Sequence, residues 1–168
     1  IGYSELLERS GENLSERGRG HAAAVRTAAT QLARSIDDVL DMAQIDADEM
    51  ALDLEDVRVA DLLAEAAARW QKEAEAAQVV IQVEHPEDIG LLRGDVRRLA
   101  QTLDHLAENA LRQTPPGGVV TLAARRGLGE VQLQVTDTGR GIPFHVQAHI
   151  FDRFIGRERG GPGLGLAL

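Results

Sequence analysis

Four short segments, in a fixed order near the end of the chain, constrain its fold more than any other feature. They are Asn109 within LAENALRQTPPGG, residues 137–142 (DTGRGI), residues 150–154 (IFDRF) and residues 161–168 (GPGLGLAL). An isolated glycine pair usually marks only a turn. The order and the spacing of the four segments together outline a nucleotide pocket.

The composition of the 168 residues is that of a globular protein and excludes several kinds of function. A hydrophobic content of 43% is ordinary for a folded domain. The net charge of -9 disfavours a surface that neutralises nucleic acid or anionic lipid. The chain has no cysteine, which excludes disulfides and thiolate metal sites. No apolar run approaches the roughly 20 residues that cross a bilayer, so we expect the cytoplasmic portion of a longer protein, which reaches a membrane only through upstream segments.

The first part of the chain has the pattern of an antiparallel helical hairpin. Residues 1–10 read as the end of one helix, and from Ala22 to Ala43 apolar residues recur at alternating steps of three and four, which is a heptad seam. A lone hairpin cannot bury this seam together with its flanks at Ala28, Leu40 and Met42. The pattern therefore favours a homodimer through a four-helix bundle. The alternative is a hairpin that packs on the rest of its own chain.

An acidic stretch at residues 46–49 predicts a domain boundary near Met50, which separates residues 1–48 from residues 49–168. The second part predicts a short strand around residues 52–57, a helix capped by Asp61, a strand at 79–84, a helix capped by Asp95 that carries Asn109, and two strands at 119–125 and 131–135 joined by a glycine turn. Helices and hairpins without regular βαβ repetition indicate an α+β domain, with a mostly antiparallel sheet and helices on one face.

Asn109 is the first candidate for chemistry, because it lies on the helix face that borders the predicted core. Burial of an amide without a partner costs a few kcal/mol. A Mg²⁺ ion would satisfy it, since Mg²⁺ prefers oxygen ligands. The alternative is an asparagine near a helix end that bonds the local backbone.

Asp137 directly follows a strand and precedes Gly139 and Gly141. Its carboxylate therefore projects from the end of the sheet, where glycines let a ligand approach closely, and it can accept a hydrogen bond from an exocyclic amine. The alternative is an aspartate that only starts a turn.

Three further glycines, Gly161, Gly163 and Gly165, precede the predicted start of a helix. Backbone N–H groups at such a junction attract phosphate. Taken alone, these glycines would indicate an ordinary loop.

In these residues the chain resembles the sensor histidine kinases of two-component signalling, and within them the ATP-binding domain shared with gyrase-type ATPases, Hsp90 and MutL. Asn109 corresponds to the N box, and residues 137–142, 150–154 and 161–167 correspond to the G1, F and G2 boxes. The resemblance implies an α/β-sandwich domain that binds ATP and Mg²⁺, with Asn109 as the Mg²⁺ ligand and Asp137 as the acceptor for the adenine amine. The residues expected to bind the cofactor are Asn109, Arg112, Asp137, Gly139, Gly141, Gly161, Gly163 and Gly165.

The resemblance covers essentially the whole chain. It implies that the hairpin is a dimerisation and histidine-phosphotransfer domain that binds a response-regulator receiver domain. It also implies that the phosphoacceptor lies upstream of Ile1 and that the ATP-binding domain continues beyond Leu168. In detail, the residues resemble a kinase-like member of the family in which tyrosine replaces the acceptor histidine.

Three positions depart from the family pattern. His105 stands where the kinases usually have a first asparagine, Gln113 where an aromatic ring often flanks the nucleotide, and Pro162 where a small hydroxyl residue is usual. The lid segment, residues 155–160, is also short. These departures favour a pseudokinase or scaffold with weak or degenerate ATP use over an active autophosphorylating kinase. A gyrase-like ATPase ranks last, because His105 occupies the position of its general base.

Overall fold

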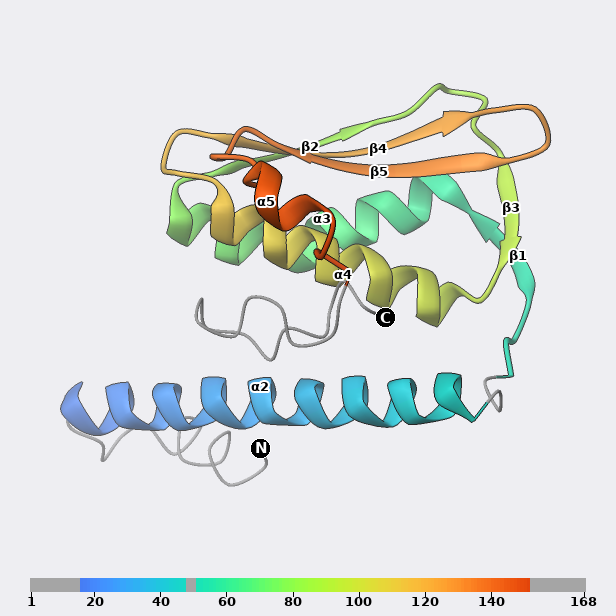
Figure 1. The fold of residues 1–168 in the computed structure, drawn as a ribbon. Helices are drawn as coiled ribbons and strands as arrows, with labels where there is room; N and C mark the ends of the chain where they lie inside the picture. The colour runs from blue at the N-terminus through green and yellow to red at the C-terminus, as the bar shows by residue number, and fades with distance from the viewer. Residues whose placement is uncertain (1–15, 48–50, 152–168) are drawn as a thin grey trace.

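The computed structural model describes residues 16–47 and 51–151 (Figure 1). Its helices and strands are, in chain order, α2 (Glu16–Asp46), β1 (Glu55–Arg58), α3 (Val59–Ala77), β2 (Val80–Glu84), β3 (Leu91–Gly94), α4 (Val96–Gln113), β4 (Val119–Arg126), β5 (Val131–Asp137) and α5 (Phe144–Gln147). Residues 1–10, for which the sequence predicts the end of the first hairpin helix, lie outside the described residues.

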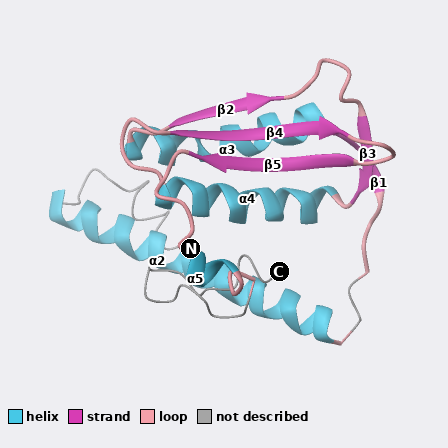
Figure 2. Ribbon diagram, turned by 45° about the horizontal axis from the view of Figure 1, so that its top comes forward, coloured by secondary structure: helices cyan, strands magenta, loops and turns pink. Residues whose placement is uncertain are grey.

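The described part of the chain is arranged in three layers (Figures 1 and 2). The sheet of β2, β4 and β5 forms one layer, and α3 and α4 together cover one of its faces. The long helix α2 lies beyond α4, on the side away from the sheet. β1 and β3 pair separately, at one end of the layered domain. The predicted α+β class, with helices on one face of the sheet, is confirmed.

The three-stranded sheet is mixed rather than mostly antiparallel as predicted. β4 pairs in antiparallel fashion with β5, from Val120 opposite Asp137 to Arg126 opposite Val131. β2, however, runs parallel to β4. The connection between these two strands contains the whole of α4, and a crossover of that length is what parallel pairing requires.

The ends of two helices show where local signals succeed and fail. Asp95 caps α4 as predicted: its Oδ1 accepts from the backbone N–H groups of Arg97 and Arg98 at 3.0 and 3.2 Å. The prediction that Asp61 caps α3 is wrong. The helix begins two residues earlier, at Val59, and Asp61 instead accepts from Arg58 Nε at 2.7 Å within the first turn.

Two strand predictions also need correction. Leu52 and Leu54 lie before β1, which covers only residues 55–58, and both side chains are about half exposed. β3 has no counterpart among the predicted strands. It is four residues long and pairs only with β1, so its burial pattern is too short to give a period.

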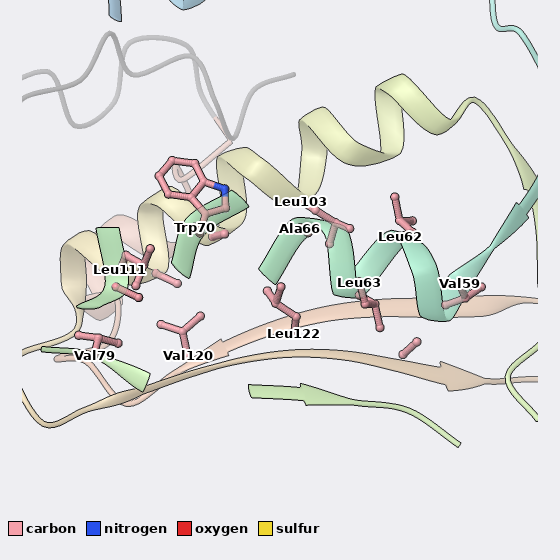
Figure 3. Close-up of a cluster of buried hydrophobic side chains, with 14 of the residues drawn as sticks. Val59, Leu62, Leu63, Ala66, Trp70, Val79, Leu103, Leu111, Val120 and Leu122 are labelled. Carbon is pink, nitrogen blue, oxygen red and sulfur yellow. The ribbon is translucent and has the colours of Figure 1, made fainter. Parts of the chain in front are cut away.

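The hydrophobic core lies between the sheet and the helices α3 and α4, as Figure 3 shows. The largest fully buried side chains in it are Val59, Leu63, Ile89, Leu103, Val120 and Leu122. Trp70 lies on the side of the core away from the sheet (Figure 3). Its indole N–H donates to Asp104 Oδ1 at 2.9 Å. That bond ties α3 to α4 and satisfies the polar atom of an otherwise buried ring.

α2 leaves most of its apolar seam uncovered. Val25, Leu32, Ile36 and Val39 are each more than half exposed, and the predicted homodimer requires such an uncovered apolar seam. Met42, predicted to be partly wet, is instead only 9% exposed. No helix in the described ranges is long and apolar enough to cross a membrane.

We expect Leu122→Ala to destabilise the domain by about 2–5 kcal/mol, because Leu122 is fully buried in the central strand and its removal leaves a cavity. Urea unfolding followed by the fluorescence of Trp70 measures this loss. The matched control is Leu128→Ala at the fully exposed β4–β5 turn, which should change stability by less than about 0.5 kcal/mol. Equal stability of the two variants would contradict the assignment of the core.

Candidate functional site

The turn after β5 packs directly on the last turn of α4. A Cβ atom at Gly139 would lie 2.5 Å from the backbone oxygen of Gln113 and 2.7 Å from Asp137 Oδ1, so only glycine fits there. Beside this contact, the side-chain oxygen of Gln113 accepts from Arg140 Nε at 3.1 Å and from Arg140 Nη2 at 2.9 Å. The turn and the helix end are therefore held together by both backbone packing and side-chain bonds.

Asp137, the last residue of β5, uses one of its two carboxylate oxygens to form the turn. Its Oδ1 accepts from the backbone N–H of Gly139 at 2.8 Å, which is the turn that the sequence allowed as the alternative. Its Oδ2 makes no hydrogen bond to any of the described residues, and the side chain is exposed. One carboxylate oxygen thus shapes the turn while the other remains available.

Thr138 anchors the same turn to β4, a role that no local sequence pattern indicates. Its Oγ1 accepts from the backbone N–H of Val119 at 2.9 Å, and its own N–H donates to Val119 O at 3.1 Å. Gly118 permits this approach, because a Cβ there would lie 2.8 Å from Thr138 Oγ1. The strand ends and the helix end thereby form one compact corner.

Asn109 lies one helical turn before Gln113 on α4, and its side chain is half-buried. Its amide makes no hydrogen bond to any described residue, so the alternative of a backbone-bonded asparagine does not apply within the described ranges. Arg112 occupies the last turn of α4 and is exposed. Gly141 lies in the turn with a φ of +69°, a conformation that favours glycine. Gly161, Gly163 and Gly165 lie outside the described residues.

The other exposed side of α4 faces α2. Asp41 Oδ2 of α2 accepts from Arg98 Nη1 and from Gln101 Nε2, both at 2.6 Å. Burial alone would raise the pKa of Asp41, but the hydrogen bonds from Arg98 and Gln101 and the positive charges of Arg98 and His105 outweigh it and lower the pKa. The hydrogen bond to Asp41 in turn raises the pKa of Arg98.

A groove of about 630 Å³ runs between these two helices. Its lining residues are Asp37, Leu40, Asp41, Gln44, Trp70, Arg97, Arg98, Ala100, Gln101, Asp104, His105 and Glu108. Asn109 and Asp137 are not among them. The groove therefore borders the candidate nucleotide site without being that site, and His105 belongs to the groove.

The donor set at the corner fits a purine nucleotide with Mg²⁺. It offers an amide without a described partner at Asn109, a carboxylate oxygen at Asp137, and open space beside the backbone of Gly141, where a Cβ would meet nothing within 4 Å. Oxygen donors are those that Mg²⁺ prefers, and a carboxylate oxygen can accept from an amine. The chemistry of these groups is compatible with such a ligand.

Comparison with known proteins identifies the domain to which the corner belongs. Residues 94–168 match the family described as histidine kinase-, DNA gyrase B-, and HSP90-like ATPase. All 168 residues align at 74% identity with the sensor protein DivL of Caulobacter vibrioides, of which they cover 22%. The chain thus spans about a fifth of that relative. The detailed resemblance that the sequence indicates is to DivL, and this resemblance is confirmed.

Solved structures agree with this family. The fold is similar to that of full-length ShkA in complex with AMPPNP, with a TM-score of 0.80 at 31% identity over 99% of this chain and 35% of ShkA. It is also similar to histidine kinase ThkA in complex with the response regulator TrrA, with a TM-score of 0.65 at 17% identity over 89% of this chain and 44% of ThkA. The second similarity shows the fold alone.

We expect Gly139→Ala to destabilise the domain by about 1–3 kcal/mol, because the added methyl group collides with backbone rather than with a flexible side chain. Urea unfolding measures the effect. Gly20→Ala is the matched control, since a Cβ at this position of α2 meets nothing within 4 Å and alanine favours helix. Wild-type stability of Gly139→Ala would contradict the close packing of the turn on α4.

Asp95 should make stability depend on pH in the acid range. The backbone N–H of Asp53 and those of Arg98 and Arg97 lower its pKa in the folded state. The charged form therefore stabilises the fold above the unfolded pKa of about 3.9, and this contribution is lost as the pH falls through the lower folded pKa. Asp95→Asn keeps a capping oxygen but cannot titrate. Its melting temperature should lie below that of the wild type at pH 6, and the difference should shrink below about pH 4. A difference that stays constant down to pH 2 would contradict this.

Proposed function

Since the chain belongs to the sensor histidine kinases and its residues 94–168 to the histidine kinase-, DNA gyrase B- and HSP90-like ATPases, we propose that it is a two-component signalling core that binds Mg-ATP weakly. Signalling proceeds chiefly through the helical hairpin, and phosphoryl transfer is reduced or dispensable. An active autophosphorylating kinase is the runner-up.

Two functional parts follow from this proposal. Residues 1–48 form the dimerisation and phosphotransfer-like hairpin, and residues 49–168 form an ATP-binding part. The end of α2 at Asp46 and the start of β1 at Glu55 support a boundary between them. We further propose that the chain acts in the cytoplasm, as expected for the kinase portion of a sensor protein.

The nucleotide site is the corner between α4 and the turn after β5. Asn109 would hold Mg²⁺ through its amide oxygen, and Asp137 Oδ2 would accept from the adenine amine while Oδ1 keeps the turn in place. Gly139 and Gly141 would shape the base pocket, Gly139 by letting the turn pack on α4 and Gly141 by leaving open space beside the backbone. Arg112 and the glycines Gly161, Gly163 and Gly165 would face phosphate. When bound, the nucleotide supplies the γ-phosphoryl group, and Mg²⁺ neutralises its charge.

Two side chains support weak nucleotide use. Gln113, at the position where an aromatic ring often flanks the base, has its amide oxygen bonded to both Arg140 donors, so no stacking surface comes from it. His105 lines the groove toward α2, which does not include Asn109 or Asp137. A polar side chain that already makes such contacts would have to give them up in order to bind the nucleotide.

Two partners complete the proposal. The exposed seam of α2 would be covered by a second copy of the chain, and a response-regulator receiver domain would dock on the resulting helical bundle. In the solved complex of ThkA with TrrA, a histidine kinase of similar fold is bound to a response regulator, and we extend that arrangement to this chain as part of the proposal. Net charge disfavours nucleic acid as a partner.

The observation that carries the proposal is the half-buried amide of Asn109, which has no described partner one turn from the Asp137 corner. We expect calorimetric titration with Mg-ATP to give a Kd weaker than about 100 μM, and Asn109→Ala to weaken binding at least about tenfold. Asp137→Asn should also weaken it, whereas Asp88→Asn removes the same charge from an exposed loop and should have no effect.

Two outcomes would contradict weak ATP use. Tight binding, together with rapid phosphoryl transfer in a longer chain that contains the acceptor, would establish the active kinase instead. Absence of binding at millimolar Mg-ATP would exclude both the kinase and the weak nucleotide site, and would leave the hairpin as the only signalling element.

A further inference from the structure

We infer that Asp41 of α2 is a positioning residue for the nucleotide site: through Arg98 and Gln101 it fixes where α4, and with it Asn109, lies against the helical hairpin. The inference rests on the proposed function only in taking Asn109 to belong to a nucleotide site. The contact itself is independent of any nucleotide.

The three side chains form a closed triangle of hydrogen bonds. Arg98 Nη1 donates to Asp41 Oδ2 at 2.6 Å and to Gln101 Oε1 at 3.0 Å. Gln101 Nε2 donates to the same Asp41 oxygen at 2.6 Å. Each donor is directed at an acceptor, and the amide of Gln101 bridges the ion pair, so the arrangement is more restrictive in geometry than a simple charge contact.

The triangle is shielded from solvent to a degree that surface ion pairs are not. The side chain of Asp41 is 14% exposed and that of Arg98 is 30% exposed. By contrast, both side chains of the Arg58–Asp61 pair are more than half exposed. A partly buried carboxylate that keeps its partners is favourable, whereas removal of one partner leaves the others desolvated and unpaired.

A second tie restrains the same end of α4. Asp95, which caps the helix through its Oδ1, also accepts from the backbone N–H of Asp53 through its Oδ2 at 3.1 Å. Asp53 belongs to the segment that leads from α2 to β1. α4 is thus tied both to α2 itself and to the segment that follows α2. Asn109 lies eight residues beyond Gln101 on the same rigid helix, so the position of the triangle determines the position of the site.

The test measures the distance between the two parts directly. The chain has no cysteine of its own, so spin labels at Thr27→Cys on α2 and Lys72→Cys on α3, both exposed, report the docked position by double electron–electron resonance. Dilution with unlabelled chain ensures that each particle carries one label pair. We expect one narrow distance for the wild type, and a fall of about tenfold or more in the ratio of docked to undocked molecules for Asp41→Ala.

Two comparisons separate positioning from a general effect of charge. Asp37→Ala removes a carboxylate one turn earlier that lines the same groove but makes no hydrogen bond or ion pair with a described residue, so it should leave the distance unchanged. Arg98→Asp should broaden the distance distribution, and Arg98→Asp combined with Asp41→Arg should restore it. An unchanged distance in Asp41→Ala, or equal broadening in Asp37→Ala, would overturn the inference.

Two further readouts keep this test distinct from that of the proposed function. Asp41→Ala should retain the urea midpoint of the core monitored through Trp70, because Asp41 lies outside the core. Its affinity for Mg-ATP should stay within about twofold of the wild type, since Asp41 is not part of the corner at Asp137. A large change in the urea midpoint would overturn the positioning role. If Mg-ATP does not bind at all, the proposed function fails while the distance measurement still decides this inference.

Discussion

The burial of one face of α4 against α3 and the sheet is the interaction on which the rest of the structure depends. Leu103, Ala107, Ala110 and Leu111 recur at steps of three and four and lie in the core. Their burial fixes the rotation of the helix about its axis. The polar residues of α4 consequently face different neighbours: α2, the turn after β5, solvent or, for Asp104, α3.

This assignment explains why the candidate site and the contact with α2 adjoin one another. Arg98, Gln101 and His105 face α2, while the helix end at Gln113 faces the turn at Gly139. Asn109 lies between these two regions. A helix that is held from three sides in this way transmits any displacement of its first turns to the residues near its end, because an α-helix is stiff over this length.

The sequence predicted those features that depend on local chemistry or on a sustained period. The cap at Asp95, the helix that carries Asn109 and the β4–β5 hairpin all have such signals, and the structure contains them. The prediction that Asp61 caps α3 was wrong because an aspartate inside the first turn of a helix cannot be told from the sequence apart from an aspartate at the N-cap position. The parallel pairing of β2 with β4, the strand β3, and the contacts of Arg140 with Gln113 and Asp41 with Arg98 join distant residues, and no local pattern encodes them.

Asp137 shows why two interpretations of one motif can be compatible, since the turn is observed and ligand binding remains a proposal. A carboxylate has two oxygens, and the backbone N–H of Gly139 takes only one of them. The turn therefore orients the free oxygen without consuming it, in the way that supporting hydrogen bonds orient ligands in other sites. The choice that the sequence posed, between an aspartate that starts a turn and one that binds a ligand, is thus not exclusive. The hydrogen bond from the Gly139 N–H to Asp137 Oδ1 would also hold Asp137 Oδ2 in place to accept from the amine of a nucleobase.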